Sequence, residues 1–155
     1  MAKKIPKEEY VVLTDQRILA DELKKSVDVC YKEGRYVAVL CIIVCGIDAL
    51  ASVNTSLGLT AHKKVYLSIL EKHFPVLSKI LGAQKFYDMY RNGMVHHFRP
   101  MKGYIMSQDQ DLNGEYVAEL EIEGRPGPRV SINMDRLIAD FIRLCDHVIS
   151  GHHLP

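Results

Sequence analysis

The chain has 155 residues, which favours a single domain over 1–155, and its 48% hydrophobic content is enough to bury a core. A formal net charge of +1 argues against a protein that coats nucleic acid through bulk electrostatics. The N-terminus leads into charged residues rather than an apolar secretory segment, and the longest apolar run, 36–47, is shorter than the roughly 20 residues of a membrane span. We therefore expect a cytoplasmic protein with no membrane partner.

Apolar residues at helical spacing predict most of the chain before Pro100 to be helical. The first helix is expected to start at Thr14 or Asp15 and to stop at Gly34, and Thr60 is expected to cap the third after a polar loop. Pro75 should break the third helix. The predicted helices therefore span about 15–33, 35–53, 60–74, 76–81 and 83–98.

Two features of these helices need an interpretation. Cys30, Cys41, Cys45 and Cys145 lie in apolar segments without zinc-ligand spacing, which predicts reduced core thiols and no metal site. Asp48 interrupts the apolar second helix. It is either a buried carboxylate with a partner or the first polar residue at a helix end, and the polar residues that follow favour the helix end.

The pattern changes after Pro100. Tyr104–Met106 is β-prone, residues 109–114 have turn composition, and residues 115–122 alternate as a half-buried strand does, which predicts a hairpin. Residues 130–132 form a third candidate strand, and Asn133 should cap a last helix that Gly151 ends. The predicted fold is mainly α: a helical bundle with a small β insertion at about 103–132, between the fourth or fifth helical segment and the C-terminal helix.

Residues 109–114 also match the first half of a calcium-binding loop, because acidic or amide side chains alternate before Gly114. The twelfth position, where a bidentate Glu would complete the site, is Leu120. The flanking residues are strand-like rather than helical. A hairpin loop closed by Asn113-Gly114 is therefore favoured over a calcium site.

The most informative stretch of the sequence lies in the predicted helix 83–98. At about 100° per residue, Asp88, Asn92 and His96 fall in one stripe with Arg91 on its flank. Phe86, Tyr90, Met94 and His97 occupy the other face. Gly93 weakens the helix by about 1 kcal/mol relative to Ala, which a close approach of backbone from a partner chain would explain.

This stretch resembles the defining motif of the HEPN superfamily, in which an Arg is followed by four to six residues, the first of them polar, and then a His. Arg91-Asn92 to His96 fits with a four-residue gap. The stretch is also similar to the nuclease domain of the unfolded-protein-response sensor kinase, where Arg-Asn precedes a His-His-aromatic triplet, as it does before His96-His97-Phe98. The likeness covers about one helix.

The resemblance implies RNA cleavage without a metal or cofactor. His96 would act as acid and base, Arg91 as phosphate clamp, and Asn92 as positioner of substrate or of the imidazole. Helix geometry adds Asp88 as an orienter. A basic patch of Arg91, His96, His97, Arg99 and Lys102 would bind RNA or a nucleotide. The resembled nucleases pair the Arg and His of two protomers, which implies a homodimer through the motif helix.

Alternatives remain open at the level of sequence. One is a non-catalytic HEPN-like module that binds a nucleotide, RNA or a partner protein with the same stripe. Another is an unrelated helical domain in which Arg91 and His96 only face solvent. A toxin or defence role would add an antitoxin or nucleotidyltransferase partner. HEPN toxins silenced by such a transferase carry a Tyr two residues after the His, where this chain has Phe98.

Overall fold

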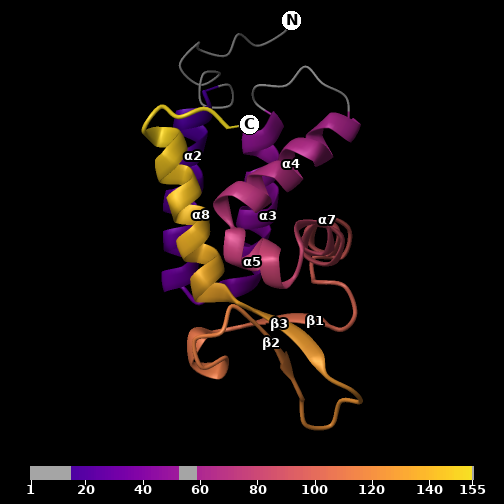
Figure 1. Cartoon of the computed structure of the whole chain (residues 1–155). Coiled ribbons are helices and arrows are strands. Elements are labelled where there is room, and N and C mark those ends of the chain that lie inside the picture. Colours follow the sequence, from indigo (N-terminus) through magenta and orange to yellow (C-terminus); the bar gives the residue numbers. More distant parts are fainter. Residues whose placement is uncertain (1–14, 53–58, 155) are drawn as a thin grey trace, which may run out of the picture.

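The computed structural model describes residues 15–52 and 59–154, with the side chains of 59–61 excepted. It confirms a mainly helical bundle with a small β insertion (Figure 1). Helix α2 packs against both α3 and α8, and α4 packs against α3. No described helix is both long and apolar enough to cross a bilayer. The larger helices are α2 (Gln16–Lys32), α3 (Tyr36–Ser52), α4 (Leu59–His73) and α8 (Met134–Ile149).

The ends of these helices follow local chemistry. The Asp15 carboxylate accepts from the Arg17 backbone N–H at 2.9 Å, and Gly34 follows α2 with a φ of 67°. Pro75 is the first residue of the short helix α5 (Pro75–Ile80), where its missing N–H costs nothing. Helix α4 already includes Leu59, one residue before the expected cap at Thr60. The Thr60 side chain and the polar loop 53–58 lie outside what the structure describes.

The core is formed by apolar side chains of α3, α4, α8 and the helix that carries the motif. Helix α3 is apolar on nearly all sides, and Val37 and Cys45 mark the one face of it that is left uncovered. Cys145 is buried in α8, whereas Cys30 and Cys41 are half-buried and Cys45 is exposed. The expectation of core thiols is therefore wrong for Cys45, because it lies on the uncovered face of α3. All four thiols are free.

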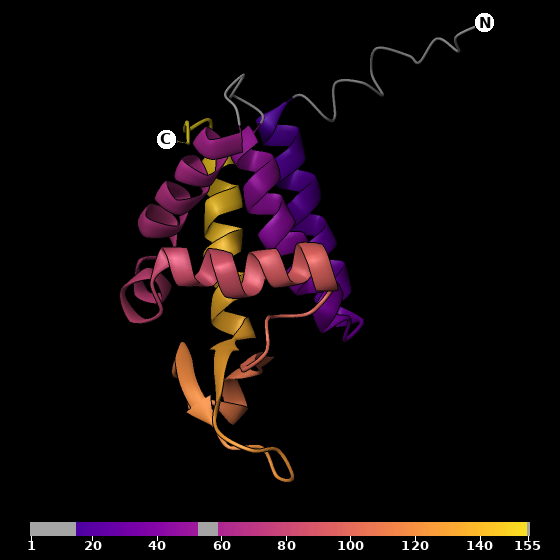
Figure 2. The ribbon, with the colours of Figure 1, turned by 90° about the vertical axis from the view of Figure 1, so that its right-hand side faces the viewer.

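Residues Ala83–His97 form one continuous helix, here called the motif helix, as predicted. It begins with α6 (Ala83–Phe86), passes through a π-helical turn (Tyr87–Arg91) and ends with α7 (Asn92–His97). In the π turn the Asn92 N–H donates to the Tyr87 carbonyl, five residues earlier. Figure 2 shows that the motif helix runs across the direction of α3 and α8.

The predicted hairpin between the first two strands is wrong. The sheet consists of β1 (Tyr104–Ser107), β2 (Val117–Leu120) and β3 (Arg129–Asn133), in the order β1-β3-β2. Strand β3 pairs with β1 in parallel and with β2 antiparallel. Its residues Ser131, Ile132 and Asn133 are buried, as expected for a central strand.

The turn between β1 and β2 explains the difference. Asn113 and Gly114 adopt positive φ angles of 49° and 77°, as a tight turn requires, but a 3₁₀ turn precedes them. The Asp109 N–H donates to Asp135 at 2.7 Å and its carboxylate accepts from the Asn133 amide at 2.6 Å. The loop is thus held against the start of α8, so it does not close a hairpin. Asn133 caps α8 as predicted, accepting from the Arg136 N–H.

Three histidine rings, here called the histidine stack, lie next to one another where α4 meets α8; the His73 and His147 rings are tilted, and the His147 and His152 rings are stacked. The ring centres of His73 and His147 are 4.9 Å apart, and those of His147 and His152 are 4.5 Å apart. The Nε2 atoms of His73 and His147 are buried without a hydrogen-bond partner among the described residues. Burial, followed by the nearby His147 and Lys72 charges, lowers the pKa of His73 to about 4. Burial also lowers the pKa of His147.

This stack should make the fold sensitive to mild acid. Because the pKa of His73 is lower in the folded chain than the ordinary 6.5, the unfolded chain binds more protons between these values. Stability is therefore complete above about pH 6.5 and falls as the pH decreases toward 4. Lowering the pH from 7.5 to 5 should lower the melting temperature of wild type. Because His73 is partly exposed, we expect this fall to be only about 2–4 °C smaller in His73→Gln. His153→Gln, outside the stack, should melt like wild type at both pH values; equal acid sensitivity of all three proteins would refute the assignment.

Candidate active site

Arg91 forms an ion pair with Asp48 across the bundle. The Arg91 Nε donates to Asp48 Oδ2 at 2.9 Å, and Nη2 donates to the same oxygen. The two residues are 43 positions apart, and their side chains are only 20% and 26% exposed. Asp48 lies inside α3 rather than at its end. The favoured interpretation of Asp48 is therefore wrong, and it is the partnered carboxylate.

Aromatic rings surround this ion pair. The Arg91 guanidinium lies 5.1 Å from the ring centre of Tyr87, which meets the buried ring of Tyr66 edge to face at 5.0 Å. Burial acts to lower the pKa of Arg91, but the hydrogen bonds and charge of Asp48 outweigh it, so the pKa lies above its usual value. Arg91 is therefore a fixed, permanently charged group.

The guanidinium keeps part of its hydrogen-bonding capacity. One N–H of Nη1 donates to the Asn92 side-chain oxygen at 3.0 Å, while Nε and Nη2 are directed at Asp48. Within 15–52 and 59–154 no group accepts from the second N–H on each terminal nitrogen, so these N–H groups can donate to a ligand. Asn92 was expected to position the substrate or the imidazole; its described contact is to the guanidinium instead. Asn92 and Asp48 together set the orientation of Arg91.

His96 and His97 lie at the C-terminal end of the motif helix and are both exposed. Their ring centres are 6.4 Å apart, and no hydrogen bond joins either ring to another described residue. His97 was expected on the packed face with Phe86, Tyr90 and Met94. Those three side chains are buried, whereas His97 is exposed. Both imidazoles are accessible to a ligand.

The structure does not bring Asp88 to the other motif residues. Its carboxylate accepts from the Gln84 side chain at 2.6 Å and lies 3.9 Å from the Lys63 Nζ. No hydrogen bond or ion pair within the described part of the chain joins Asp88 to Arg91, Asn92 or His96. The contacts of Asp88 hold the motif helix to α4.

Gly93 is the point where the chain folds back on the motif helix. A Cβ built at Gly93 would lie 2.6 Å from the Arg99 carbonyl oxygen and 2.8 Å from the Met101 nitrogen. The Met101 N–H also donates to the Met89 carbonyl at 2.8 Å. The backbone that approaches Gly93 therefore belongs to this chain, and not to a partner chain as expected. This contact fixes Arg99 and Lys102, two residues of the predicted basic patch, next to the motif.

The predicted site residues thus divide into two groups. Arg91 and Asn92 are joined, while His96, His97, Arg99 and Lys102 follow at the exposed helix end. Sequence reasoning missed Asp48 as the partner of Arg91; its only signal was a carboxylate in an apolar helix. Across 15–52 and 59–154, no group of three or more His, Cys, Asp or Glu side chains is placed to hold a metal ion. Comparison with protein-family models, curated proteins and solved structures finds no match to this chain.

Proposed function

We propose that the protein is a metal-independent endoribonuclease of HEPN type. One observation carries the proposal. A single helix presents Arg91 together with an exposed imidazole at His96. Arg91 is oriented by Asp48 and Asn92 and has N–H groups without a partner among the described residues. A guanidinium that is held in place can bind two oxygens of a phosphate without further reorganisation.

The chemistry follows from these two groups. A neutral imidazole accepts the proton of a ribose 2′-hydroxyl, whose oxygen forms a bond to the adjacent phosphorus. The bond from phosphorus to the 5′-oxygen breaks, and that oxygen takes a proton from an imidazolium. Arg91 stabilises the charge that develops on the phosphoryl oxygens. The products are a 2′,3′-cyclic phosphate and a free 5′-hydroxyl.

A homodimer would complete such a site. Arg91 and His96 are five positions apart, which at about 100° per residue turns their side chains roughly 140° apart around α7. Their described contacts do not join them. A twofold axis beside the motif helix would set His96 of one protomer opposite Arg91 of its partner, so that acid and base groups flank the phosphate.

An apolar surface is available for that association. Phe98 is 74% exposed, and Val37 and Val95 are 54% and 39% exposed. Phe98 lines a hollow of about 620 Å³ together with Tyr36, Cys41 and Ile42 of α3. Exposed aromatic and aliphatic side chains next to a functional motif are typical of an interface core. We assign this surface to a second copy of the chain, because its position extends the motif helix.

Phe98→Asp is therefore expected to convert the dimer to a monomer, because each interface would bury two uncompensated carboxylates. Light scattering coupled to size exclusion measures the change. Val76→Asp, an equally apolar and 49% exposed position on α5, serves as the control and should leave the dimer intact. A wild-type monomer at all concentrations, or a Phe98→Asp dimer, would contradict the assignment.

Cleavage itself is tested on a mixed pool of single-stranded RNA in the presence of EDTA. We expect fragments that end in 2′,3′-cyclic phosphate, detected by mass spectrometry. RNA in which every 2′-hydroxyl is methylated should remain intact, because the nucleophile is blocked. Cleavage of the methylated RNA, or fragments with 5′-phosphate ends, would identify a different reaction.

A second candidate is a non-catalytic module that binds RNA, a nucleotide or a partner protein. The ion pair of Arg91 with Asp48 favours this alternative, since an arginine whose charge is compensated by a carboxylate can have a purely structural role in the bundle. Binding of RNA without cleavage at high protein concentration would select this alternative. A toxin or defence setting, with an antitoxin partner, belongs to the first candidate.

A further inference from the structure

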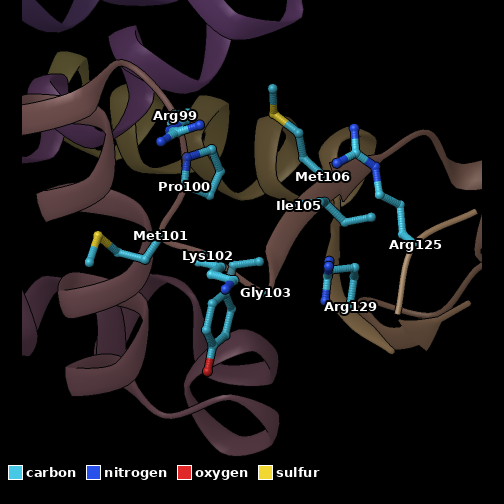
Figure 3. A pocket seen from close by; sticks show the side chains of 10 residues that line it. Arg99, Pro100, Met101, Lys102, Gly103, Ile105, Met106, Arg125 and Arg129 are labelled. Atoms are coloured by element: carbon cyan, nitrogen blue, oxygen red, sulfur yellow. The ribbon is translucent and has the colours of Figure 1, made fainter. Parts of the chain in front are cut away.

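A hollow of about 630 Å³ lies next to the end of the motif helix. Arg99 and Lys102 line it from the segment that follows that helix, and Arg125 and Arg129 line it from the other side (Figure 3). The parallel pairing of β1 with β3 explains why these segments meet. Parallel strands start at the same edge of a sheet, so the residues that precede both strands lie together.

The charge in this hollow is not compensated. None of the four cations lies within ion-pair distance of an acidic side chain in the described part of the chain, unlike Lys24 or Arg143. The residues that line the hollow include no Asp or Glu. Glu121 and Glu123 line a neighbouring hollow that Arg125 also lines. Four like charges around one concave surface favour an anionic ligand.

Apart from the four cations and Gly103, the residues that line the hollow are apolar or aromatic and are here called its floor: Pro100, Met101, Tyr104, Ile105 and Met106. Tyr104 and Met106 also pack against the core. The Lys85 Nζ adds a further cation 5.9 Å from the ring centre of Tyr104. Cations around an apolar and aromatic floor suit a ligand with alternating phosphates and flat bases, which is the arrangement of single-stranded nucleic acid.

We propose that this hollow holds single-stranded RNA on one side of the phosphate that the motif cleaves. This inference rests on the proposed function. The hollow lies close enough to the motif to hold the neighbouring nucleotides, because at most about 10–11 Å of backbone separates His96 from Arg99. The hydrogen bond from Met101 to Met89 and the contact at Gly93 keep the hollow fixed relative to the motif helix. The phosphates contact Arg99, Lys102, Arg125 and Arg129, and a base lies on the floor.

The test measures binding separately from cleavage. The probe is a fluorescein-labelled, 2′-O-methylated single-stranded RNA, which lacks the nucleophile, and the readout is fluorescence anisotropy on the full chain. Arg125→Gln/Arg129→Gln should weaken binding by about tenfold or more. It should also reduce the slope of log K against log salt by about 1.4, since each contact to a single-stranded phosphate contributes about 0.7. Lys102→Gln, in an exposed loop, gives the same test without altering a strand and should reduce the slope by about 0.7.

The control removes equal charge elsewhere. Lys64→Gln/Lys72→Gln on α4, which lies far from the sheet in Figure 1, should change binding less than twofold. Binding that is equally reduced in the control and hollow variants would overturn the proposal, as would displacement of the RNA by micromolar ATP, which would assign the hollow to a free nucleotide. If wild type cuts no RNA but the hollow variants lose binding, the proposed nuclease function is refuted and the RNA site in the hollow is supported. If wild type cuts RNA and the hollow variants bind RNA normally, only the proposed RNA site in the hollow is refuted.

Discussion

His96→Ala is expected to lower cleavage of single-stranded RNA in EDTA by at least about a hundredfold, which is the low end of what one acid/base group contributes. Arg91→Ala should cause a loss of similar size, because transition-state charge on the phosphoryl oxygens would lose its clamp. The rates are measured under single-turnover conditions with a labelled oligonucleotide. A wild type that leaves RNA intact, or a His96→Ala protein that cuts equally well, would end the enzymatic interpretation.

The two substitutions differ in their structural risk. His96 has no described hydrogen bond, so its removal should leave the fold unchanged. Arg91→Ala leaves the half-buried Asp48 carboxylate without its ion-pair partner, which destabilises the bundle independently of any role in catalysis. Arg91→Lys is the sharper variant, since it keeps the charge beside Asp48 but loses the fork that binds two oxygens. His153→Ala, at an exposed position outside the motif, controls for loss of a histidine.

Gly93→Ala should destabilise the protein by about 1–3 kcal/mol, although helix propensity alone predicts a gain of about 1 kcal/mol. The new methyl group would lie 2.6 Å from the Arg99 carbonyl oxygen and 2.8 Å from the Met101 nitrogen. Both atoms belong to backbone, which cannot rotate away as a side chain can. Relieving the contact requires the Met101 to Met89 hydrogen bond to lengthen. Chemical denaturation measures the change in the free energy of unfolding.

Gly46 provides a matched comparison in another helix. A Cβ there would lie 2.9 Å from Phe141 Cζ and 3.2 Å from two methyl groups of Leu23, all of them side-chain ends. These atoms can shift, so Gly46→Ala should cost less than Gly93→Ala. If Gly93→Ala instead stabilises the chain, the segment 99–101 does not pack on the motif helix as described. The position of the basic hollow next to that helix would then also be contradicted.

The helices were predictable because their signals are local. Asp15, Gly34, Pro75 and Asn133 each act on backbone groups a few residues away, and the face of α8 repeats at the helical period. The apolar composition of α3 likewise indicated a core helix. It did not show which face stays uncovered, because that depends on which helices pack around it.

The strand order and the site geometry depend on contacts that are distant in sequence. Residues 130–132 read as an optional third strand, yet β3 is central because it alone pairs on both edges. The partner of Arg91 lies 43 residues away, so no spacing within the motif identifies Asp48. The motif spacing correctly placed Arg91, Asn92 and His96 on one helix. It could not reveal the π turn within that helix.

The π turn also has an evolutionary consequence. It holds one more residue than an α-helical turn, so loss of a single codon between Phe86 and Arg91 would close it into an ordinary helix. The extra residue is absorbed within the turn, so the side chains on either side of the deletion would keep nearly their present relative directions. A deletion elsewhere in the motif helix would instead rotate all the following side chains by about 100° relative to the preceding ones. Loss of one residue within the π turn should therefore be tolerated far better than loss of one residue before or after it, and sequencing of a randomised library selected for stable expression would show that bias.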